Sequence, residues 1–285
     1  MKILVTGGRG QLGRSLVRAA AARGDAVVAL GPDTLDVTAP AQIALALRAH
    51  QPDVVINGAA YTGVDRAEAE RDRAFAINAD GAGQVARACA ACSVPLLHVS
   101  TDYVFDGAAT RPYREDAPVS PRNAYGASKA AGERQVVDAG GVVVRTSWLF
   151  GEGGPSFVHA ILRLARARPT LHVVADQHGC PTCADDLAAA LLELATRERS
   201  GIYHACGAGP TTWHGFAAAI VDEARRHTAL ACERVEPITT AEYPTPARRP
   251  AYSVFDTGRL RALGIALPSW RSGLRRVIAA AVGAS

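Results

Sequence analysis

Lysine, aromatic residues and long apolar segments are scarce in this sequence. Of its 31 Lys+Arg residues only Lys2 and Lys129 are lysine, and aromatic residues make up 6% of the 285 residues. No apolar run approaches the roughly 18 residues that cross a bilayer. The apolar start runs into glycines after a few residues, which is too short for a secretory signal. We therefore expect a cytoplasmic protein without a membrane partner.

Neither basic nor acidic residues are concentrated in one part of the sequence. The formal net charge is +4, and the basic residues are scattered along the chain. A nucleic-acid surface would need a stripe of like charge, so we expect a small-molecule substrate and no nucleic-acid partner. Because arginine stands at nearly every basic position, an internal lysine such as Lys129 indicates a place where an ammonium group is needed.

The six cysteines include two Cys-x-x-Cys pairs, Cys89 with Cys92 and Cys180 with Cys183. Zinc ribbons join two such pairs across about 15 to 20 residues, and the gap here is far longer. The first pair lies in an alanine-rich helical run, which favours small thiols packed inward in a reducing compartment. We expect structural cysteines and no metal, with a zinc or redox pairing as the alternative.

Short apolar runs alternate with helical patterns in the first half of the chain. Runs rich in Val, Ile and Leu without polar alternation are typical of parallel strands covered by helices on both faces. The predicted strands are Lys2–Thr6, Ala26–Leu30, Asp53–Asn57, Pro95–Ser100 and Val142–Arg145, and the predicted helices lie near Leu12–Ala22, Ala41–His50, Ala74–Cys92 and Ala124–Asp138. This alternation predicts an α/β fold with a Rossmann-type doubly wound parallel sheet.

The pattern changes after Ser147, where glycine and proline become dense in stretches such as GEGGPSF and CGAGPTTW. Long loops of this composition commonly bind or cover a ligand. We expect a dinucleotide-binding domain at residues 1–147. Residues 148–285 should form mainly a smaller C-terminal substrate-binding lobe, with segments at about 175–206 returning to the main domain.

A glycine-rich turn follows the first predicted strand directly. Gly7, Gly10 and Gly13 have the spacing that lets backbone amides approach a pyrophosphate and lets the next helix pack closely on the strand. The second strand ends without the acid that grips an adenosine ribose, and Arg9 lies within the turn, where a cation suits a 2′-phosphate. This combination favours NADPH as the cofactor, with NADH as the alternative.

Tyr125 and Lys129 lie four residues apart in a predicted helix and so share one face. A ketone that accepts a hydride needs a proton, which a phenol can give. Lowering a phenol pKa by about 3 units takes roughly 4 kcal/mol, which one cation about 4 Å away supplies at an effective dielectric near 20. Thr101, or its neighbour Ser100, ends the fourth predicted strand and can hold the substrate carbonyl.

These motifs resemble the extended short-chain dehydrogenase/reductase family. The finer similarity is to the branch that reduces the C4 ketone of dTDP-linked 4-dehydro-6-deoxy-L-mannose. The similar stretches cover the chain almost end to end and are Asn57–Glu70, Ser100–Gly107, Pro112–Asp116, Tyr125–Glu133, Arg145–Gly151, Asp176–Thr182, Gly201–Gly207 and Tyr243–Thr257. The last two are quite specific to this branch.

The resemblance implies a role for each matching position. The implied catalytic residues are Thr101, Tyr125 and Lys129. The implied cofactor contacts, taken with Arg9 from the turn, are Gly7, Gly10, Gln11, Leu12, Gly13, Asp36, Val37, Ala59, Ala60, Tyr61, Thr62, Tyr125 and Lys129. The implied substrate contacts are Thr62, Val64, Thr101, Asp102, Tyr125, Trp148, Arg248 and Arg249. Either Arg248 or Arg249 is expected to face the nucleotide diphosphate, because guanidinium suits phosphate oxygens.

Other functions on the same scaffold stay open. A dehydratase would carry a second acid after Asp102, where this chain has Tyr103. An epimerase needs the same Tyr/Lys pair, and a non-catalytic subunit resembling the methionine adenosyltransferase β-subunit needs neither. Some family members dimerise around magnesium held by carboxylates. The matching positions here are Ser15 and Arg271, so we expect no such metal and leave homodimer and monomer open.

Overall fold

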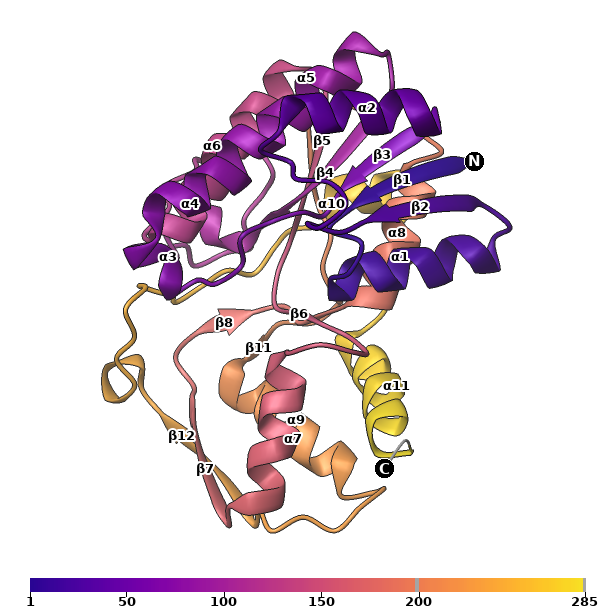
Figure 1. Ribbon diagram of the computed structural model, residues 1–285. Helices are drawn as coiled ribbons and strands as arrows, with labels where there is room; N and C mark the ends of the chain where they lie inside the picture. Colours follow the sequence, from indigo (N-terminus) through magenta and orange to yellow (C-terminus); the bar gives the residue numbers. More distant parts are fainter. Residues whose placement is uncertain (198–199, 284–285) are drawn as a thin grey trace.

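A computed structural model describes residues 1–197 and 200–283. Its central feature is a six-stranded sheet in the order β10-β5-β4-β3-β1-β2, with every strand parallel to its neighbours (Figure 1). The strands are β1 (Lys2–Thr6), β2 (Ala26–Leu30), β3 (Val54–Asn57), β4 (Leu96–Thr101), β5 (Val142–Thr146) and β10 (Ile202–His204). The predicted doubly wound parallel sheet is confirmed, and the five strands expected in the first half lie within one residue of their predicted bounds.

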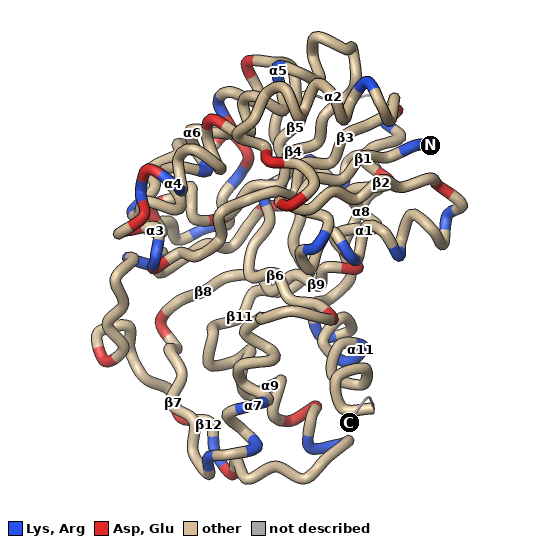
Figure 2. The backbone as a smooth tube through the Cα atoms, in the orientation of Figure 1, with Lys and Arg blue, Asp and Glu red and all other residues tan. Residues whose placement is uncertain are grey.

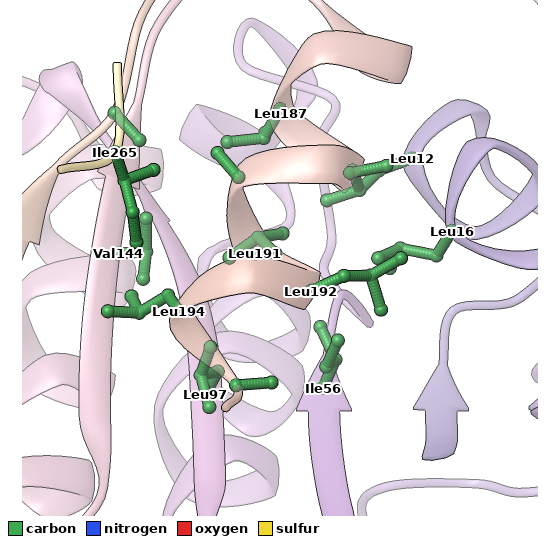
Figure 3. Packing of buried hydrophobic residues seen from close by; sticks show 14 of the residues in the cluster. Leu12, Leu16, Ile56, Leu97, Val144, Leu187, Leu191, Leu192, Leu194 and Ile265 are labelled. Carbon is green, nitrogen blue, oxygen red and sulfur yellow. The ribbon is translucent and has the colours of Figure 1, made fainter. Parts of the chain in front are cut away.

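Helices cover both faces of this sheet because its strands are apolar on both sides. α2 (Pro40–His50), α5 (Ala82–Ala91) and α6 (Ala124–Asp138) lie on one face, and α1 (Gln11–Ala22) and α8 (Ala184–Leu194) on the other. Figure 3 shows how the leucines of α8 fill the space between α1 and the sheet. They meet Leu12, Leu16, Ile56, Leu97, Val144 and Ile265.

The predicted helix Ala74–Cys92 is one helical run with a change of pitch. It consists of α4 (Arg71–Phe75), a π-helical segment η1 (Ala76–Gly81) and α5. Single π turns inside helices are often found at functional sites. Here the π turn places the buried side chain of Asn78 toward the loop that follows β3.

A second layer lies below the sheet in Figure 1 and has its own apolar core, which includes Phe150, Phe216 and Trp270. Two small sheets pair β6 (Leu149–Phe150) with β9 (Thr182–Cys183), and β8 (His178–Gly179) with β11 (Thr211–Thr212). The larger elements are α7 (Phe157–Ala167), β7 (Thr170–Val174), α9 (Trp213–Ala224), β12 (Arg234–Ile238) and α11 (Trp270–Gly283), and the short ones are α3 (Arg66–Ala69), η2 (Asp102–Val104), η3 (Thr240–Glu242) and α10 (Gly258–Ala262).

Three segments of the second half of the chain belong to the same body as the main sheet. α8 packs on α1, β10 extends the sheet beside β5, and Leu260, Ile265 and Leu267 enter the core under α8. Figure 2 shows basic and acidic residues scattered over both halves of the molecule. Among the described helices, none has both the length and the apolar character needed to cross a membrane.

Candidate active site

The site lies where the strand order reverses. The chain moves from β1 outward to β2 on one side, and from β3 outward to β4 and β5 on the other, so loops after β1 and β3 diverge at this point. Open α/β sheets bind ligands in the crevice outside the carboxyl ends of their strands at such a switch point. The glycine turn follows β1 there, and Gly58–Thr62 follow β3.

Two glycines of the turn are required by close backbone contacts. Gly7 has a φ of +68°, and a Cβ on it would lie 2.7 Å from the carbonyl of Gly58. A Cβ on Gly13 would lie 2.5 Å from the oxygen of Gly7, so α1 packs directly on the turn. The turn is therefore built for close approach of the backbone.

The first turn of α1 has the properties of an anion site. Its N-cap is Gly10, which offers no side-chain acceptor, and no acidic residue lies in the first turn. The partial positive charge of a helix N-terminus favours phosphate at this place. Leu12 points into the core, whereas the amide of Gln11 reaches the carbonyls of Gly154 and Pro155. The residues present thus fit the pyrophosphate of a dinucleotide.

The other predicted cofactor residues flank this turn. Arg9 forms an exposed ion pair with Asp33 just beyond β2. Asp36 accepts hydrogen bonds from the hydroxyl and backbone N–H of Thr38, which lower the pKa of its carboxyl, and Val37 is buried beside Gly81. Arg9 therefore has a carboxylate partner that a 2′-phosphate would have to displace or share.

Asn78 fixes the loop after β3. Its amide oxygen accepts from the backbone N–H of Tyr61 at 2.8 Å, and its NH2 group donates to the carbonyl of Tyr61 and to the hydroxyl of Ser128 on α6. This buried residue thereby connects Ala59–Thr62 with the Tyr/Lys helix. Sequence analysis missed Asn78, whose one signal is an amide directly after the apolar residues Ala74–Ile77.

Capping and glycines position α6. Asn123 caps the helix by accepting from the N–H of Gly126 at 2.7 Å. A Cβ on Gly126 would lie 2.1 Å from the oxygen of Tyr103, and one on Gly132 would lie 2.1 Å from that of Asn78. The small residues between Tyr125 and Glu133 therefore let α6 lie directly against η2 and η1.

Tyr125 meets the end of β4 through Thr101. A hydrogen bond with the Thr101 hydroxyl lowers the pKa of the phenol, but burial outweighs it, and with the nearby charge of Asp102 it raises the pKa to about 12. The Thr101 hydroxyl also lies 3.1 Å from Oδ1 of Asp102, and its single hydrogen can be donated to only one of these partners at a time. The hydroxyl beside the phenol is thus that of Thr101, and the phenol holds its proton at neutral pH.

Lys129 lies on the same helix and is buried, with 2% exposure. Its Nζ donates to the carbonyl of Val99 at 2.7 Å and lies 3.1 Å from Nε2 of His98. Burial lowers the pKa of the amine to about 8, and the charge of Glu133 partly offsets this. The predicted action of Lys129 on Tyr125 stays a prediction, since no cation lowers the phenol pKa here.

Trp148 adopts a backbone conformation that non-glycine residues seldom take, with a φ of +47°. Its ring stacks on Trp213 with centroids 3.6 Å apart and covers Gly179, where a Cβ would lie 2.5 Å from the indole. The Trp148 ring is thus packed between two other segments of the chain, at Gly179 and Trp213. Trp213 was not among the predicted site residues because nothing local marks an aromatic residue at a helix start.

A cavity of about 830 Å³ opens between α7, β7 and the segment around residues 238–249. Its lining includes Tyr103, whose ring meets that of Tyr125 edge-on, together with Trp213 and Arg249. Aromatic faces and a guanidinium suit a nucleotide base and its phosphates. Neither Tyr125 nor Lys129 lines the cavity, and Tyr103 is the lining residue that contacts Tyr125.

The two predicted diphosphate arginines differ in placement. Arg249 lines the cavity and forms a two-pronged ion pair with Asp65 at 2.8 and 3.0 Å. Arg248 is exposed, and its backbone oxygen accepts from Asn123. Of the two arginines, Arg249 is therefore the one at the cavity. Thr62 is exposed and Val64 half-buried on the loop after β3.

The cysteines and the matched magnesium positions lie elsewhere. Cys89, Cys180 and Cys183 are buried free thiols, and Cys92 is an exposed one. Ser15 is buried and accepts from Arg18, and Arg271 lies over the ring of Trp270. Within residues 1–197 and 200–283, no three His, Cys, Asp or Glu side chains gather as metal ligands.

Sheet order, glycine turn and Tyr/Lys helix together define a dinucleotide-binding α/β protein of the short-chain dehydrogenase/reductase class. The sequence profile described as the RmlD substrate binding domain matches residues 1–282. The chain belongs to that family, which confirms the resemblance inferred from the sequence.

Relatives of known name match over nearly the whole chain. A dTDP-4-dehydrorhamnose reductase from Burkholderia thailandensis is 46% identical, covering 95% of this chain and 96% of its own. One from Streptomyces griseus is 45% identical, covering 98% and 94%. The crystal structure of dTDP-4-dehydrorhamnose reductase from Bacillus anthracis in complex with NADP superposes with a TM-score of 0.92 at 38% identity, covering 97% and 98%.

Proposed function

We propose that the chain is an NADPH-dependent dTDP-4-dehydrorhamnose reductase. It transfers a hydride to the C4 ketone of dTDP-4-dehydro-6-deoxy-L-mannose and yields dTDP-L-rhamnose or a related deoxysugar nucleotide. NADH is the alternative cofactor. The observation that carries the proposal is the Tyr125 phenol beside the Thr101 hydroxyl at the carboxyl end of β4, one helical turn from a buried lysine.

The comparisons support the same reaction. Relatives more than 40% identical over nearly the full chain carry the reductase name, and a structure with a TM-score of 0.92 holds NADP. We assign residues 1–147, with α8 and β10, to cofactor binding, and the second layer to the nucleotide sugar. The proposed location is the cytoplasm, where the chain's six free thiols stay reduced.

Three side chains take part in the proposed chemistry. Bound NADPH supplies the hydride that reaches C4. Thr101 turns its hydroxyl hydrogen from Asp102 to the ketone oxygen and aligns it. Tyr125 gives its proton to that oxygen as the carbonyl becomes an alcohol. A nearby Lys129 ammonium stabilises the phenolate left behind, which then recovers its proton from solvent.

The remaining proposed residues hold the two ligands in place. The amides of Gly7 to Gly13 and the start of α1 bind the pyrophosphate, with Arg9 toward the 2′-phosphate. Ala59–Thr62, fixed by Asn78, border the nicotinamide half. Trp148 borders the sugar, and Arg249 binds the diphosphate in the cavity after exchanging part of its contact with Asp65.

The test is a direct assay of the purified chain with NADPH and the dTDP-4-keto sugar. We expect loss of NADPH absorbance and, by NMR of the product, a C4 alcohol. Epimerised nucleotide sugar and tightly retained NAD, without net oxidation of added NADPH, would identify an epimerase instead. Absence of any turnover would favour the regulatory role.

A further inference from the structure

The loop of residues 152–155, which joins β6 to α7, lies against the start of α1 (Figure 1). The amide nitrogen of Gln11, the first residue of α1, is 3.2 Å from the carbonyl oxygen of Gly154 and 3.2 Å from that of Pro155. A carbonyl oxygen can only accept, so both hydrogens of this amide are donated to the loop. The loop is therefore attached where the helix start offers its N–H groups to a pyrophosphate.

The same loop follows one side of α1 for two helical turns. Arg14 and Arg18 lie three and seven residues after the first residue of the helix and so share a face with it. A Cβ on Gly153 would lie 3.1 Å from Nη1 of Arg14, and Oε2 of Glu152 lies 3.9 Å from Nη2 of Arg18. Successive residues of the loop thus meet successive turns of the helix.

Gly153 and Gly154 have a conformation that presents backbone donors. Their φ angles are +72° and +96°, a region that residues with a side chain rarely adopt, and both glycines are exposed. Within residues 1–197 and 200–283, neither of their backbone N–H groups has a hydrogen-bond partner. Consecutive N–H groups in such turns commonly bind anions. The loop thus has two unpaired donors next to the phosphate site at the start of α1.

The other end of the loop continues into a wall of the nucleotide-sugar cavity. Ser156 follows the loop directly and caps α7 by accepting from the backbone N–H of His159. Phe157 and Ala160, in the first turn of α7, line the cavity, and the ring of Phe157 also packs on Trp213 with centroids 4.6 Å apart. The loop therefore connects the phosphate site of the cofactor with the cavity for the nucleotide sugar.

We propose that residues 152–155 are a strap that closes over the pyrophosphate of the cofactor and couples its binding to that of the nucleotide sugar. Gln11 anchors the strap, and the N–H groups of Gly153 and Gly154 donate to the phosphate oxygens. This adds a segment of the second layer to the cofactor site. It rests on the proposed function, in which NADPH is exchanged at every turnover: the strap opens for that exchange, and a nucleotide in the cavity keeps it closed by fixing α7.

Hydrogen exchange in the unaltered protein tests the closure without any substitution. We expect the backbone amides of residues 151–157 to exchange about fivefold more slowly, or slower still, when NADPH saturates the protein, because the strap then lies on a bound ligand. The turn at Gly140, between α6 and β5, is the internal control. Gly140 is another exposed glycine with a positive φ, of +80°, and its exchange should stay the same.

Gly154→Ala weakens the strap through the backbone. The added Cβ would lie 3.6 Å from Cγ of Gln11, an ordinary contact, so the strain comes from the φ of +96°. We expect NADPH to dissociate about tenfold faster, as measured by stopped-flow displacement with excess NADP. Gly24→Ala is the matched control and should release NADPH at the unaltered rate. Gly24 also has a positive φ, of +75°, with open space for a Cβ, but it follows the far end of α1.

The coupling is tested with dTDP, the nucleotide part of the proposed substrate. Saturating dTDP should lower the Kd for NADPH by about fivefold or more. NADPH should lower the Kd for dTDP by the same factor, because coupling between two binding sites is reciprocal. In Gly154→Ala this factor should fall towards one. Isothermal titration calorimetry of both proteins measures these affinities.

Unchanged exchange at residues 151–157 on NADPH binding, or equal rates of NADPH release from Gly154→Ala and Gly24→Ala, would overturn the strap. Affinities for NADPH and dTDP that do not depend on each other would overturn the coupling. None of these measurements needs turnover. A protein that shows the closure and the coupling but fails the reductase assay keeps the strap and loses the proposed reaction, whereas an active reductase without them loses the strap alone.

Discussion

Asp102 is a buried carboxyl whose charged form is disfavoured by burial. It is 1% exposed, its Oδ2 has no hydrogen-bond partner within the described chain, and burial raises its pKa to about 6. A folded-state pKa above the unfolded one means that the folded chain binds the proton more tightly. The stabilising contribution of the protonated group is complete below about pH 4 and is lost as the pH rises through about 6.

Replacing Asp102 with asparagine should therefore stabilise the protein at neutral pH. We expect Asp102→Asn to raise the free energy of unfolding by up to about 3 kcal/mol above pH 6, and to change it little near pH 4. Denaturant unfolding of both proteins at these two pH values measures the effect. An equal difference at both pH values would show that the charge is not its cause.

For single residues, the sequence predicted the reactive side chains better than the residues that contact them. Tyr125 and Lys129 were found because a spacing of four residues defines a helix face without knowledge of the fold. His98, which lies beside Lys129, was not assigned, because the two residues become neighbours only through the packing of α6 on β4. The Arg249 contact with Asp65 joins residues 184 positions apart, which no local pattern indicates.

Helix α6 is fixed to strand β5 by a buried ion pair. Arg145 and Glu133 form two hydrogen bonds of 2.9 and 2.7 Å, and neither side chain is more than 4% exposed. Removing one partner leaves a buried charge without compensation, which typically costs about 3–5 kcal/mol.

We expect Glu133→Gln to lower the free energy of unfolding by about 3–5 kcal/mol, as measured by denaturant unfolding. Asp222→Asn, which breaks an exposed pair with Arg225, is the matched control and should change it by less than about 1 kcal/mol. Equal effects of the two substitutions would contradict a special role for the buried pair.

The Trp148 stack depends on the absence of a side chain at Gly179. In Gly179→Ala the added Cβ would lie 2.5 Å from the indole, so the ring must leave Trp213. We expect KM for the nucleotide sugar to rise about tenfold, equivalent to about 1.4 kcal/mol, with the Kd for NADPH unchanged. Gly283→Ala, where the methyl group meets open space, is the control. A raised Kd for NADPH would instead mean that the change had spread to the cofactor side.

For the whole molecule, the sequence predicted the sheet but little of how the second half is arranged. Uninterrupted apolar runs identify buried parallel strands, and five of the six were found in this way. β10 has only three residues and joins the sheet beside β5, which is distant in sequence. The cavity between α7, β7 and residues 238–249 arises from packing between segments that no periodicity connects.

The measurement that tests the central claim most directly compares Tyr125→Phe with the unaltered chain. A phenol that acts as general acid contributes roughly 100- to 10,000-fold to turnover. We expect kcat for reduction of the dTDP-4-keto sugar to fall by that much while the Kd for NADPH stays the same. Tyr113→Phe is the matched control, because its phenol donates to Asp106 outside the site, and its kcat should change little. A Tyr125→Phe variant that turns over at the unaltered rate would contradict the account.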